Sequence, residues 1–420
     1  MNALSARRDT AVPLTGLRVL DLSGWWAGAF VGFNLAVFGA EVIKLEAIQR
    51  VDGSRGRDSF ASPLGYEKHP PFLAHNLGKL GITLDLSRPE GRAVLKQLVR
   101  TSDVLVNNYG ARVMGNFGLT YEVLREENPA LIMMSMPGFG MTGPWKDYVG
   151  FAYNMEQLSG IAHLTGWPDG PPTNVGSAAD PMVGLFGLFA VFAALEHRSR
   201  TGEGQFIDVS HLEALTSLVG PEVLDYQMTH VVPTRSGNRS RHAAPSGCYP
   251  CKGDDDWVAI AAHGEGQWER LCTALGEPAW CRDERFSTLR SRLAHQDELD
   301  ELLATWTRER TADEAMRLLQ GHGIPAGAVL TPAKLRQDRH LHARNYFQTL
   351  DREHVGTQAY DRLAFRVDGA PLDYPRPAPL LGEHNTRVLK ELLGIGAQGY
   401  GALEAAEVIG NKPVRRGKPA

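Results

Sequence analysis

Asp180 is the residue whose type and position most directly suggest chemistry in this sequence. It precedes Pro181 and the apolar run from Met182 to Leu195, so we expect Asp180 to be the N-cap of a helix. The simplest role for an aspartate there is structural. The same position suits a nucleophile, because the helix dipole favours the ionised carboxylate and nearby backbone N–H groups can stabilise an oxyanion. The apolar helix would also keep water from an acyl intermediate.

Three glycines lie in a segment expected directly after a strand. Gly138, Gly140 and Gly143 in GFGMTG match the pattern GxGxxG and follow the apolar run 131–136. In a dinucleotide-binding protein this pattern opens a helix whose N-terminus holds the pyrophosphate. Here a Pro-Trp pair follows the last glycine, which favours a loop. We therefore expect no nicotinamide or flavin site.

The histidines and cysteines that could bind a metal are poorly spaced for it. His340, His342 and His384 have no HExxH motif or carboxylate cluster beside them, and we expect no metal site. Cys248 and Cys251 form a CxxC inside a predicted β-hairpin. They have neither the second close pair of a zinc site nor the helix start of a redox-active pair. We interpret them as core or surface thiols, and their role stays open.

The composition excludes several kinds of partner. The chain has 420 residues, 43% hydrophobic residues and a net charge of −4, so it carries no strong field for nucleic acids or anionic membranes. The start of the chain lacks the apolar segment of a secretory signal. The longest apolar run, Met182 to Leu195, is shorter than the ~20 residues that span a bilayer. We expect a cytoplasmic enzyme in which this run forms a buried helix.

Predicted strands and helices alternate through the first third of the chain. Short β-branched and apolar runs predict strands, and the amphipathic or Gly-spaced apolar segments between them predict helices. This alternation is typical of a parallel, doubly wound, Rossmann-like sheet of the α/β class. The predicted strands cover residues 17–23, 40–46, 81–86, 103–108 and 131–136.

A change of character near residue 226 suggests two domains, as the length of the chain also does. We assign residues 10–225 to the first part of a large α/β domain and residues 226–335 to a smaller α+β domain. Residues 336–400 return to the large domain. The polar end of the sequence leads us to expect a flexible tail over 401–420.

Several segments, spread over nearly the whole chain, are informative through their order and spacing. They are PLTGLRVLDLSGWWAG, FGAEVIKLE, NLGKLGITLDLSRPEGR, NPALIMMSMPGFGMTGP, ALEHRSRTGEGQFIDVS, GIPAGAV and APLLGEHNTRVL. Together they resemble the class III coenzyme-A transferases. That group contains formyl-CoA transferase, carnitine and bile-acid CoA-transferases and the α-methylacyl-CoA racemases.

The resemblance implies an enzyme that moves CoA from an acyl-CoA donor to a free carboxylic acid through an aspartyl mixed anhydride and aspartyl-CoA. It implies that Asp180 carries the acyl group, and that Gly138 and Gly140 lie in the loop near the thioester. Coenzyme A is a substrate, with succinyl-CoA or acetyl-CoA as the donor suggested by the family, and no permanently bound cofactor is implied. The family's interlocked, ring-like homodimer is implied as well.

The resemblance also implies residues that contact the coenzyme. They are Trp25, Trp26 and Ala27 in the turn after the first strand, with Lys79, Asn108 and Tyr109. At Ala47, Asn116 and Gly150 the sequence departs from basic positions of formyl-CoA transferase, so other basic residues must hold the coenzyme phosphates. The available ones are Lys44, Arg50, Arg55 and Lys79. The two tryptophans suggest a larger or apolar acyl group, or packing on the coenzyme.

Two alternatives to a transferase stay open. A racemase of the same family would use a histidine downstream of the glycine loop, whereas the corresponding residues here are Gly150, Phe151 and Ala152. Without an imidazole there, two-base proton transfer lacks one base. The other alternative is a catalytically degenerate protein that binds acyl-CoA. Retention of Asp180 and of the glycine loop favours the transferase.

Overall fold

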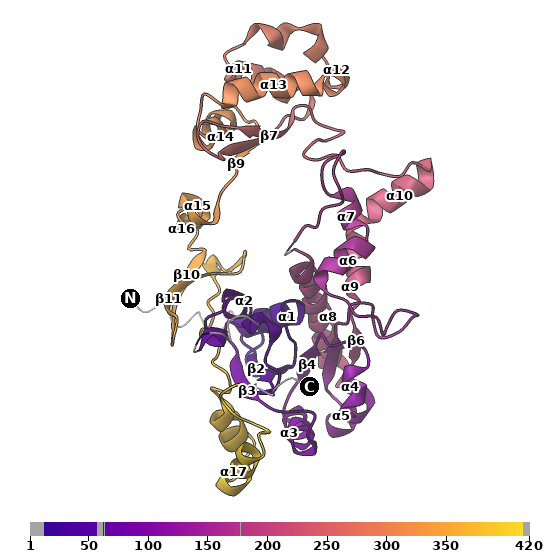
Figure 1. The fold of residues 1–420 in the computed structure, drawn as a ribbon, viewed down its shortest axis with the longest axis vertical. Helices are drawn as coiled ribbons and strands as arrows, with labels where there is room; N and C mark the ends of the chain where they lie inside the picture. The colour runs from indigo at the N-terminus through magenta and orange to yellow at the C-terminus, as the bar shows by residue number, and fades with distance from the viewer. Residues whose placement is uncertain (1–11, 57–61, 63, 177, 415–420) are drawn as a thin grey trace. The chain divides into compact units, whose positions relative to one another are not determined.

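The computed structural model describes residues 12–56, 62, 64–176 and 178–414. The chain forms two compact units (Figure 1). The larger unit comprises the described residues up to Ala162, those from Asn174 to Val231 and those from His342 onward, and the smaller unit comprises His163–Thr173 and Val232–Leu341. The main part of the smaller unit thus begins after helix α10 (Gly220–Thr229), a few residues later than the sequence suggested.

A parallel six-stranded sheet forms the centre of the larger unit. Its strand order is β3-β2-β1-β4-β5-β6, and every neighbouring pair is parallel. The strands before and after this point are added to opposite sides of β1, so the strand order reverses between β1 and β4. In such sheets ligands bind at this switch point, beyond the carboxyl ends of the strands. The predicted Rossmann-like α/β fold is confirmed. The strands are β1 Arg18–Asp21, β2 Glu41–Glu46, β3 Leu80–Thr83, β4 Val104–Asn107, β5 Ile132–Ser135 and β6 Phe206–Asp208.

Alternate residues of the strands point into two separate cores. Leu20, Ile43 and Leu105 belong to the core that includes helices α3 (Pro89–Arg100) and α5 (Tyr121–Glu127). Val19 and Val42 belong to the core on the other face, which includes α1 (Ala27–Val37) and α8 (Ala179–Thr201). Because both faces are covered, the strands are apolar on both sides.

Helix α8 is buried on one side only. It packs against α1 and β5, but Leu185, Phe186 and Phe189 are exposed. The sequence predicted a buried helix over this run, and that prediction is wrong for the exposed side. Among the described residues α8 is the one helix long and apolar enough to cross a membrane. Its buried side, however, is part of the core of the larger unit.

The end of the chain is ordered up to Val414, which contradicts the flexible tail predicted from residue 401. Helix α17 covers Ala397–Ala405, and Val408 and Ile409 are fully buried in the core beneath the sheet. The Thr83 hydroxyl donates to the Gly410 carbonyl at 2.6 Å. The apolar Val-Ile pair anchors the segment despite its polar neighbours. Residues 415–420 of the predicted tail lie outside the described residues.

The smaller unit is an antiparallel sheet of order β7-β8-β9 with helices packed on it. The predicted hairpin around the CxxC is confirmed, since β7 (Ser246–Pro250) and β8 (Trp257–Ala261) pair antiparallel. Cys248 is exposed on β7 and Cys251 is buried directly after it, and both are free thiols. The other elements of this unit are α11 Gly264–Ala274, α12 Leu289–Ala294, α13 Gln296–Thr307, α14 Ala312–Gly321, β9 Ala326–Ala328 and α15 Pro332–Arg336.

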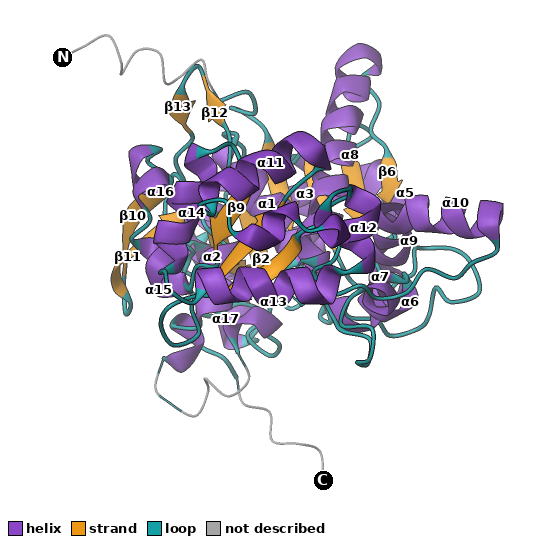
Figure 2. Cartoon of the chain, turned by 90° about the horizontal axis from the view of Figure 1, so that it is seen from above, coloured by secondary structure: helices purple, strands orange, loops and turns teal. Residues whose placement is uncertain are grey.

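Helices and loops make up most of the chain (Figure 2). The remaining helices of the larger unit that bear on the site are α2 Pro70–His75, α4 Val113–Asn116, α6 Ala152–Leu158 and α9 His211–Thr216. A hairpin of β10 Phe347–Arg352 and β11 Gly356–Asp361 and the π-helix η7 Thr386–Leu392 precede α17.

Candidate active site

The turn after β1 leads into α1 at the switch point of the sheet. Trp25 lies in this turn with a φ of 62°, a left-handed conformation that costs a bulky residue energy and that is found mainly at functional sites. Its backbone N–H donates to Asp52 Oδ1 at 2.9 Å. The indole is 46% exposed and lies so close to Gly53 that a Cβ there would be 2.3 Å from the ring. The fold therefore holds an exposed indole in a strained turn.

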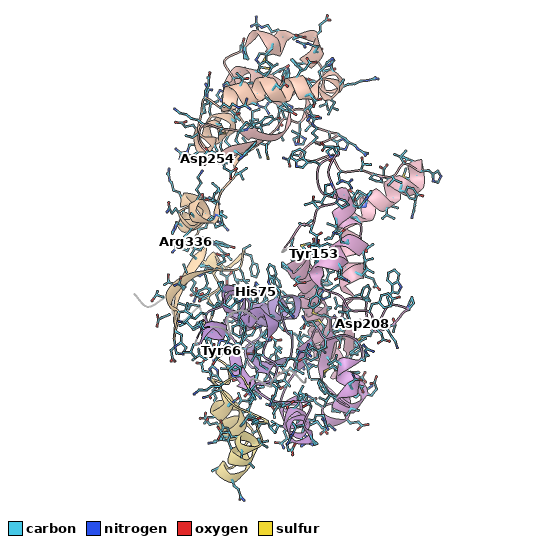
Figure 3. The ribbon with its side chains drawn as sticks, viewed as in Figure 1. Tyr66, His75, Tyr153, Asp208, Asp254 and Arg336 are labelled. Carbon is cyan, nitrogen blue, oxygen red and sulfur yellow. The ribbon has the colours of Figure 1, made fainter. Side chains whose placement is uncertain are left out.

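Trp26 and Ala27 continue this turn into the helix. The Trp26 ring stacks on His75 of α2, with ring centroids 4.4 Å apart (Figure 3 labels His75). Burial, together with the charge of Lys79, lowers the pKa of His75 to about 4, so this imidazole is neutral at physiological pH. Ala27 is the first residue of α1 and is buried.

Asn108 and Tyr109 follow β4, on the other side of the switch point. Asn108 joins the two sides, because its Oδ1 accepts from Gly24 N at 2.9 Å and its Nδ2 donates to Gly24 O at 2.7 Å. Burial raises the pKa of the half-buried Tyr109 to about 12, so its hydroxyl keeps its proton and can donate a hydrogen bond. The structure thus brings together Trp25, Trp26, Ala27, Asn108 and Tyr109.

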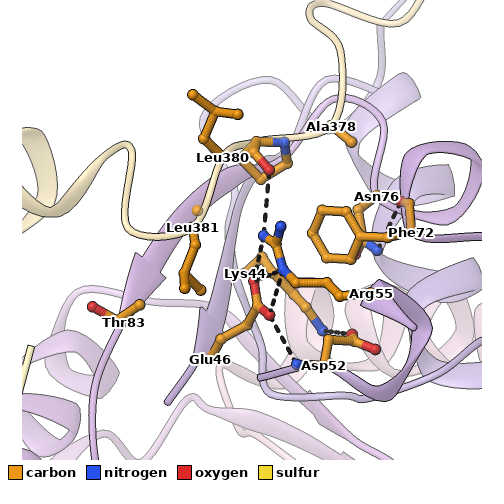
Figure 4. A network of polar contacts seen from close by, with 12 residues as sticks. Lys44, Glu46, Asp52, Arg55, Phe72, Asn76, Thr83, Ala378, Leu380 and Leu381 are labelled. Atoms are coloured by element: carbon orange, nitrogen blue, oxygen red, sulfur yellow. Dashed lines mark hydrogen bonds and ion pairs between the residues drawn. The ribbon is translucent and has the colours of Figure 1, made fainter. Parts of the chain in front are cut away.

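A network of buried ion pairs supports this turn from below. Lys44 Nζ lies 2.7 Å from Asp52 Oδ2 (Figure 4), and Lys79 Nζ lies 2.7 Å from Asp21 Oδ2. Lys79 also donates to the Asn76 side chain at 2.8 Å and to a backbone carbonyl. Both lysines are fully buried, and such charges are tolerated inside a protein only when they are paired.

The basic residues that the sequence offered as equal candidates for binding the coenzyme phosphates differ in their burial. Lys44 and Lys79 are fully buried and paired, and Arg55 is fully buried between Glu46 and Glu67, at 2.8 Å from each. These three support the turn and do not reach its surface, so a direct coenzyme contact by Lys79 does not fit this arrangement. Arg50 is exposed.

Arg50 also lies beside the site. Its charge is close enough to Tyr109 to act against the rise in the pKa of that phenol. Among the four basic residues it is therefore the one that combines exposure with a place next to the switch point.

Asp180 lies in the first turn of α8, and it does not cap the helix. The N-cap is Ala178, without a side-chain hydrogen bond, and Asp180 is the second helical residue, so the N-cap prediction is wrong. The carboxylate is consequently free for other contacts. Burial, and then the charge of Glu156, raise the pKa of the half-buried Asp180 to about 6. At neutral pH it is a more basic carboxylate than an ordinary aspartate.

Helix α8 reaches α1 close to Asp180. Gly184, one turn further along α8, lies so near the start of α1 that a Cβ there would be 3.1 Å from the Ala27 carbonyl oxygen. Helix–helix contact of this closeness needs a residue without a side chain. It places the first turn of α8 next to the turn that holds Trp25 and Trp26.

Glu156 on α6 is a site residue that sequence reasoning missed. It is 1% exposed, and its Oε2 accepts from the backbone N–H groups of Val175 at 2.9 Å and Gly176 at 3.4 Å. Its Oε1 is buried and has no partner among the described residues. A glutamate in a short helix normally faces water, so the sequence carries no signal for this burial.

The glycine loop packs against α6. A Cβ on Gly138 would contact Met155, the neighbour of Glu156, at 3.5 Å. Gly140 has a φ of 81°, which favours glycine, and the following Met141 N–H donates to Asp208 Oδ2 at 2.9 Å. The chain then runs through turns to Gly150 and opens no helix. Gly138 thus lies beside the helix that carries Glu156, whereas Gly140 lies beside Asp208 and Ser210.

His211, the first residue of α9, is a second buried polar residue that the sequence did not single out. Burial lowers its pKa to about 4, although the carbonyl of Met136 accepts a hydrogen bond from its ring. Its Nε2 is buried without a partner within the described part of the chain. Leu212 N donates to the Gly138 carbonyl at 3.0 Å, so His211 lies at the base of the glycine loop.

Comparison with known proteins shows to which family the chain belongs. The profile of CoA-transferase family III matches residues 14–385. The chain belongs to this family. It is 36% identical to succinyl-CoA–D-citramalate CoA-transferase of Chloroflexus aurantiacus, over 94% of this chain and 98% of that protein. It is 35% identical to succinate–glutarate CoA-transferase of Agrobacterium fabrum, over 90% of this chain and 96% of that protein.

The solved structures agree with the family assignment. A crystal structure of a CAIB/BAIF family protein from Brucella suis matches with a TM-score of 0.81 and 33% identity, over 91% of this chain and all of that one. Relatives of this closeness over most of the chain show that the protein is a class III CoA-transferase.

The family member described here has an aromatic residue where racemases of the group were expected to have a histidine. Phe151 is the N-cap residue of α6 and is 59% exposed. It meets the Trp25 ring edge-on, with centroids 6.0 Å apart and planes at 82°. No imidazole stands at Gly150, Phe151 or Ala152, so no second base is available from these residues. Within the described residues no group of three or more potential metal ligands occurs.

Proposed function

We propose that this CoA-transferase works through a covalent intermediate on Asp180. The observation that carries the proposal is the state of its carboxylate, which lies half-buried in the first turn of α8 with its pKa raised to about 6 by burial and by Glu156. A carboxylate that is less stabilised by its surroundings is a better nucleophile once it is ionised. The dipole of α8 can stabilise the oxyanion formed on attack.

The reaction we propose conserves one activated acyl bond in each step. Asp180 attacks the thioester carbonyl of the donor, which gives an aspartyl mixed anhydride and the CoA thiolate. The thiolate then attacks the Asp180 carbonyl, which gives aspartyl-CoA and releases the donor acid. The acceptor carboxylate attacks aspartyl-CoA and expels the thiolate, which finally takes the new acyl group and frees Asp180.

The coenzyme is proposed to bind at the switch point of the sheet. The exposed Trp25 indole lies in the turn at this place, and Tyr109 follows the neighbouring strand β4. Arg50 is the basic residue we assign to a phosphate, because Lys44, Arg55 and Lys79 are buried in ion pairs. The printed names of the relatives pair succinyl-CoA or succinate with other carboxylic acids, which supports exchange between an acyl-CoA and a free acid.

We propose a homodimer in the cytoplasm. On α8 the exposed side chains of Leu185, Phe186 and Phe189 form an apolar face, and Leu224 and Met228 on α10 are exposed as well. A second copy of the chain that covers these residues would remove them from water. Light scattering on the purified protein measures the mass directly, and a monomer would contradict the proposal.

Chemical trapping tests the covalent step. The enzyme is incubated with an acyl-CoA and no acceptor, then treated with hydroxylamine or borohydride, and the peptides are mapped by mass spectrometry. We expect a modified Asp180 that depends on the acyl-CoA. Modification elsewhere, or full transferase activity in Asp180→Ala, would show that the mechanism is wrong.

The same preparation separates the transferase from the two alternatives. A racemase would exchange the α-proton of a 2-methylacyl-CoA with deuterium from the solvent, and a degenerate binding protein would bind acyl-CoA without forming an adduct. We expect an adduct and no exchange, because Phe151 stands where the second base would be needed.

A further inference from the structure

The charged groups around Asp180 are unusual for a site that handles carboxylic acids. Helix α1, which packs against α8, carries no charged residue, and Glu156 is the one charged residue of α6. Helix α8 has no further charge between Asp180 and Glu196, and β5 has none. On α9, His211 is neutral because burial lowers its pKa to about 4, and Glu213 is exposed.

Among the described residues, the four elements that pack most extensively on α8, namely α1, α6, α9 and β5, thus carry no lysine or arginine. The buried lysines beneath the switch point, Lys44 and Lys79, are already paired with Asp52 and Asp21. A second carboxylate on a substrate would find no counter-charge among these groups. It would instead meet the buried charge of Glu156, whose Oε1 has no partner among the described residues.

The exposed surface beside these carboxylates is aromatic. Trp25 and Phe151 touch edge to face and are 46% and 59% exposed. Trp25 precedes α1, whose start contacts Gly184 of α8, and Phe151 begins the helix that carries Glu156. Tyr153 is exposed on the same helix (Figure 3). The two rings thus stand at the starts of α1 and α6, which both pack against α8, the helix whose first turn holds Asp180.

We propose that this site takes monocarboxylic acids with an apolar, preferably aromatic, body, and that Glu156 excludes acids that carry a second carboxylate. The proposal rests on the proposed function of Asp180. The carboxylate that reacts loses its charge when it forms the anhydride, so Glu156 does not oppose its transfer. A second carboxylate stays charged throughout and is repelled by Glu156 in every bound state. The aromatic rings offer an apolar body favourable edge and face contacts.

The substrate preference distinguishes this chain from the relatives named above, two of which act on acids with two carboxylates according to their names. Butyryl-CoA serves as the donor, and pentanoate, glutarate and 3-phenylpropanoate serve as acceptors, each read by the mass of its new thioester. Pentanoate and glutarate have the same chain length and differ in the second carboxylate. We expect kcat/KM for pentanoate to exceed that for glutarate by about tenfold or more, and 3-phenylpropanoate to be better still. Equal or better use of glutarate would overturn the proposal.

Two variants assign the selectivity to its residues. Glu156→Gln keeps an oxygen that can accept from Val175 N and Gly176 N but removes the charge. We expect it to reduce the preference for pentanoate over glutarate by about tenfold, whereas Glu126→Gln, at an exposed position of α5, leaves the preference unchanged. Phe151→Ala is expected to lower the ratio of 3-phenylpropanoate to pentanoate, and Phe365→Ala, at another exposed phenylalanine, is not.

The ratio of the kcat/KM values for two acceptors, measured in one enzyme preparation, does not depend on how much of a variant is folded. An unchanged ratio in Glu156→Gln would therefore contradict the role of Glu156 even if total activity falls. Trapping of Asp180 with butyryl-CoA tests the proposed function separately from the proposed substrate class. An adduct with the opposite selectivity refutes only the substrate class, whereas no adduct with any acyl-CoA refutes the proposed function.

Discussion

Two sets of carboxylates in the larger unit have opposite electrostatic surroundings. Asp21 and Asp52 are buried, yet the charges of Lys79 and Lys44 outweigh the effect of burial and hold both pKa values below the usual range. For Asp180, burial and then the charge of Glu156 raise the pKa, and no cation of the described residues acts against them. The first set is stable and shapes the turn at the switch point. The second is held in an unfavourable state, and the proposed acylation of Asp180 would relieve it by removing the charge.

The comparison predicts the largest effect at Asp180 itself. Asp180→Asn keeps the shape of the side chain and removes the nucleophile, so we expect transfer to fall by about a thousandfold or more. The thermal midpoint should stay near that of the wild-type protein, since no cation loses its partner. Activity is measured as kcat/KM with an acyl-CoA and a free acid. Activity within tenfold of wild type would contradict the assignment.

Substitutions in the set of carboxylates that are paired with lysines should instead lower the stability of the fold. Lys79→Met leaves Asp21 buried without its closest cation, and we expect a loss of about 3–5 kcal/mol in the free energy of unfolding. The matched control is Lys96→Met, because Lys96 forms a partly exposed pair with Glu127 at 3.3 Å, and such pairs contribute about 0–1 kcal/mol. Urea unfolding followed by circular dichroism measures both. Similar losses in the two variants would mean that the buried pair has no special structural role.

The pH dependence of the reaction sharpens the difference between the two sets. In the proposed mechanism only the ionised form of Asp180 attacks. Its pKa is raised to about 6, so kcat/KM should rise with pH through about 6 and level off above it. Glu156→Gln removes the repelling charge, and the midpoint should move to lower pH. In Glu126→Gln the midpoint should not move. Titration of the coenzyme contributes equally in the wild-type protein and in both variants, so it does not affect the comparison. A midpoint that stays in place in Glu156→Gln would rule out the coupling.

The same raised pKa affects stability in the opposite direction. A carboxyl group whose pKa is higher in the folded than in the unfolded chain stabilises the fold in its protonated form. This contribution is present below the ordinary value of 3.8 and is lost as the pH rises through about 6.

The smallest effect is expected at the surface of the switch point. Arg50→Gln removes an exposed charge that we assign to a coenzyme phosphate, so KM for acyl-CoA should rise by about tenfold while kcat changes little. Arg317→Gln, at an exposed position of α14, is the control. The effect should weaken at high salt. An unchanged KM would contradict this assignment and show that another residue binds the phosphate.

Much of the fold could be predicted because it depends on local patterns. The alternation of apolar strands with helices indicated the parallel sheet, and the order of the family segments indicated a class III CoA-transferase. At the end of the chain the same reasoning was wrong. A polar composition suggested a tail, but Val408 and Ile409 fill the core beneath the sheet.

The state of each charged residue could not be predicted in this way. Lys79 resembled a coenzyme contact in the sequence, but its partner Asp21 lies 58 positions away and holds it inside the protein. Arg55 is fixed by Glu46 and Glu67 and is within reach of the Pro379 carbonyl, 324 positions away. Such contacts depend on how distant strands and loops are brought together, and no local pattern records them.

The sequence by itself determined the family and the order of the elements, and it singled out Asp180 as the candidate nucleophile. Only the tertiary structure decided that Asp180 is not a helix cap, because the position of Ala178 and the packing of α8 on α1 set where the helix begins. It also decided that Glu156 is buried near Asp180, with one carboxylate oxygen that has no partner among the described residues. The electrostatic state of a carboxylate depends on its neighbours in space, and these come together only when α6, α8 and α1 pack.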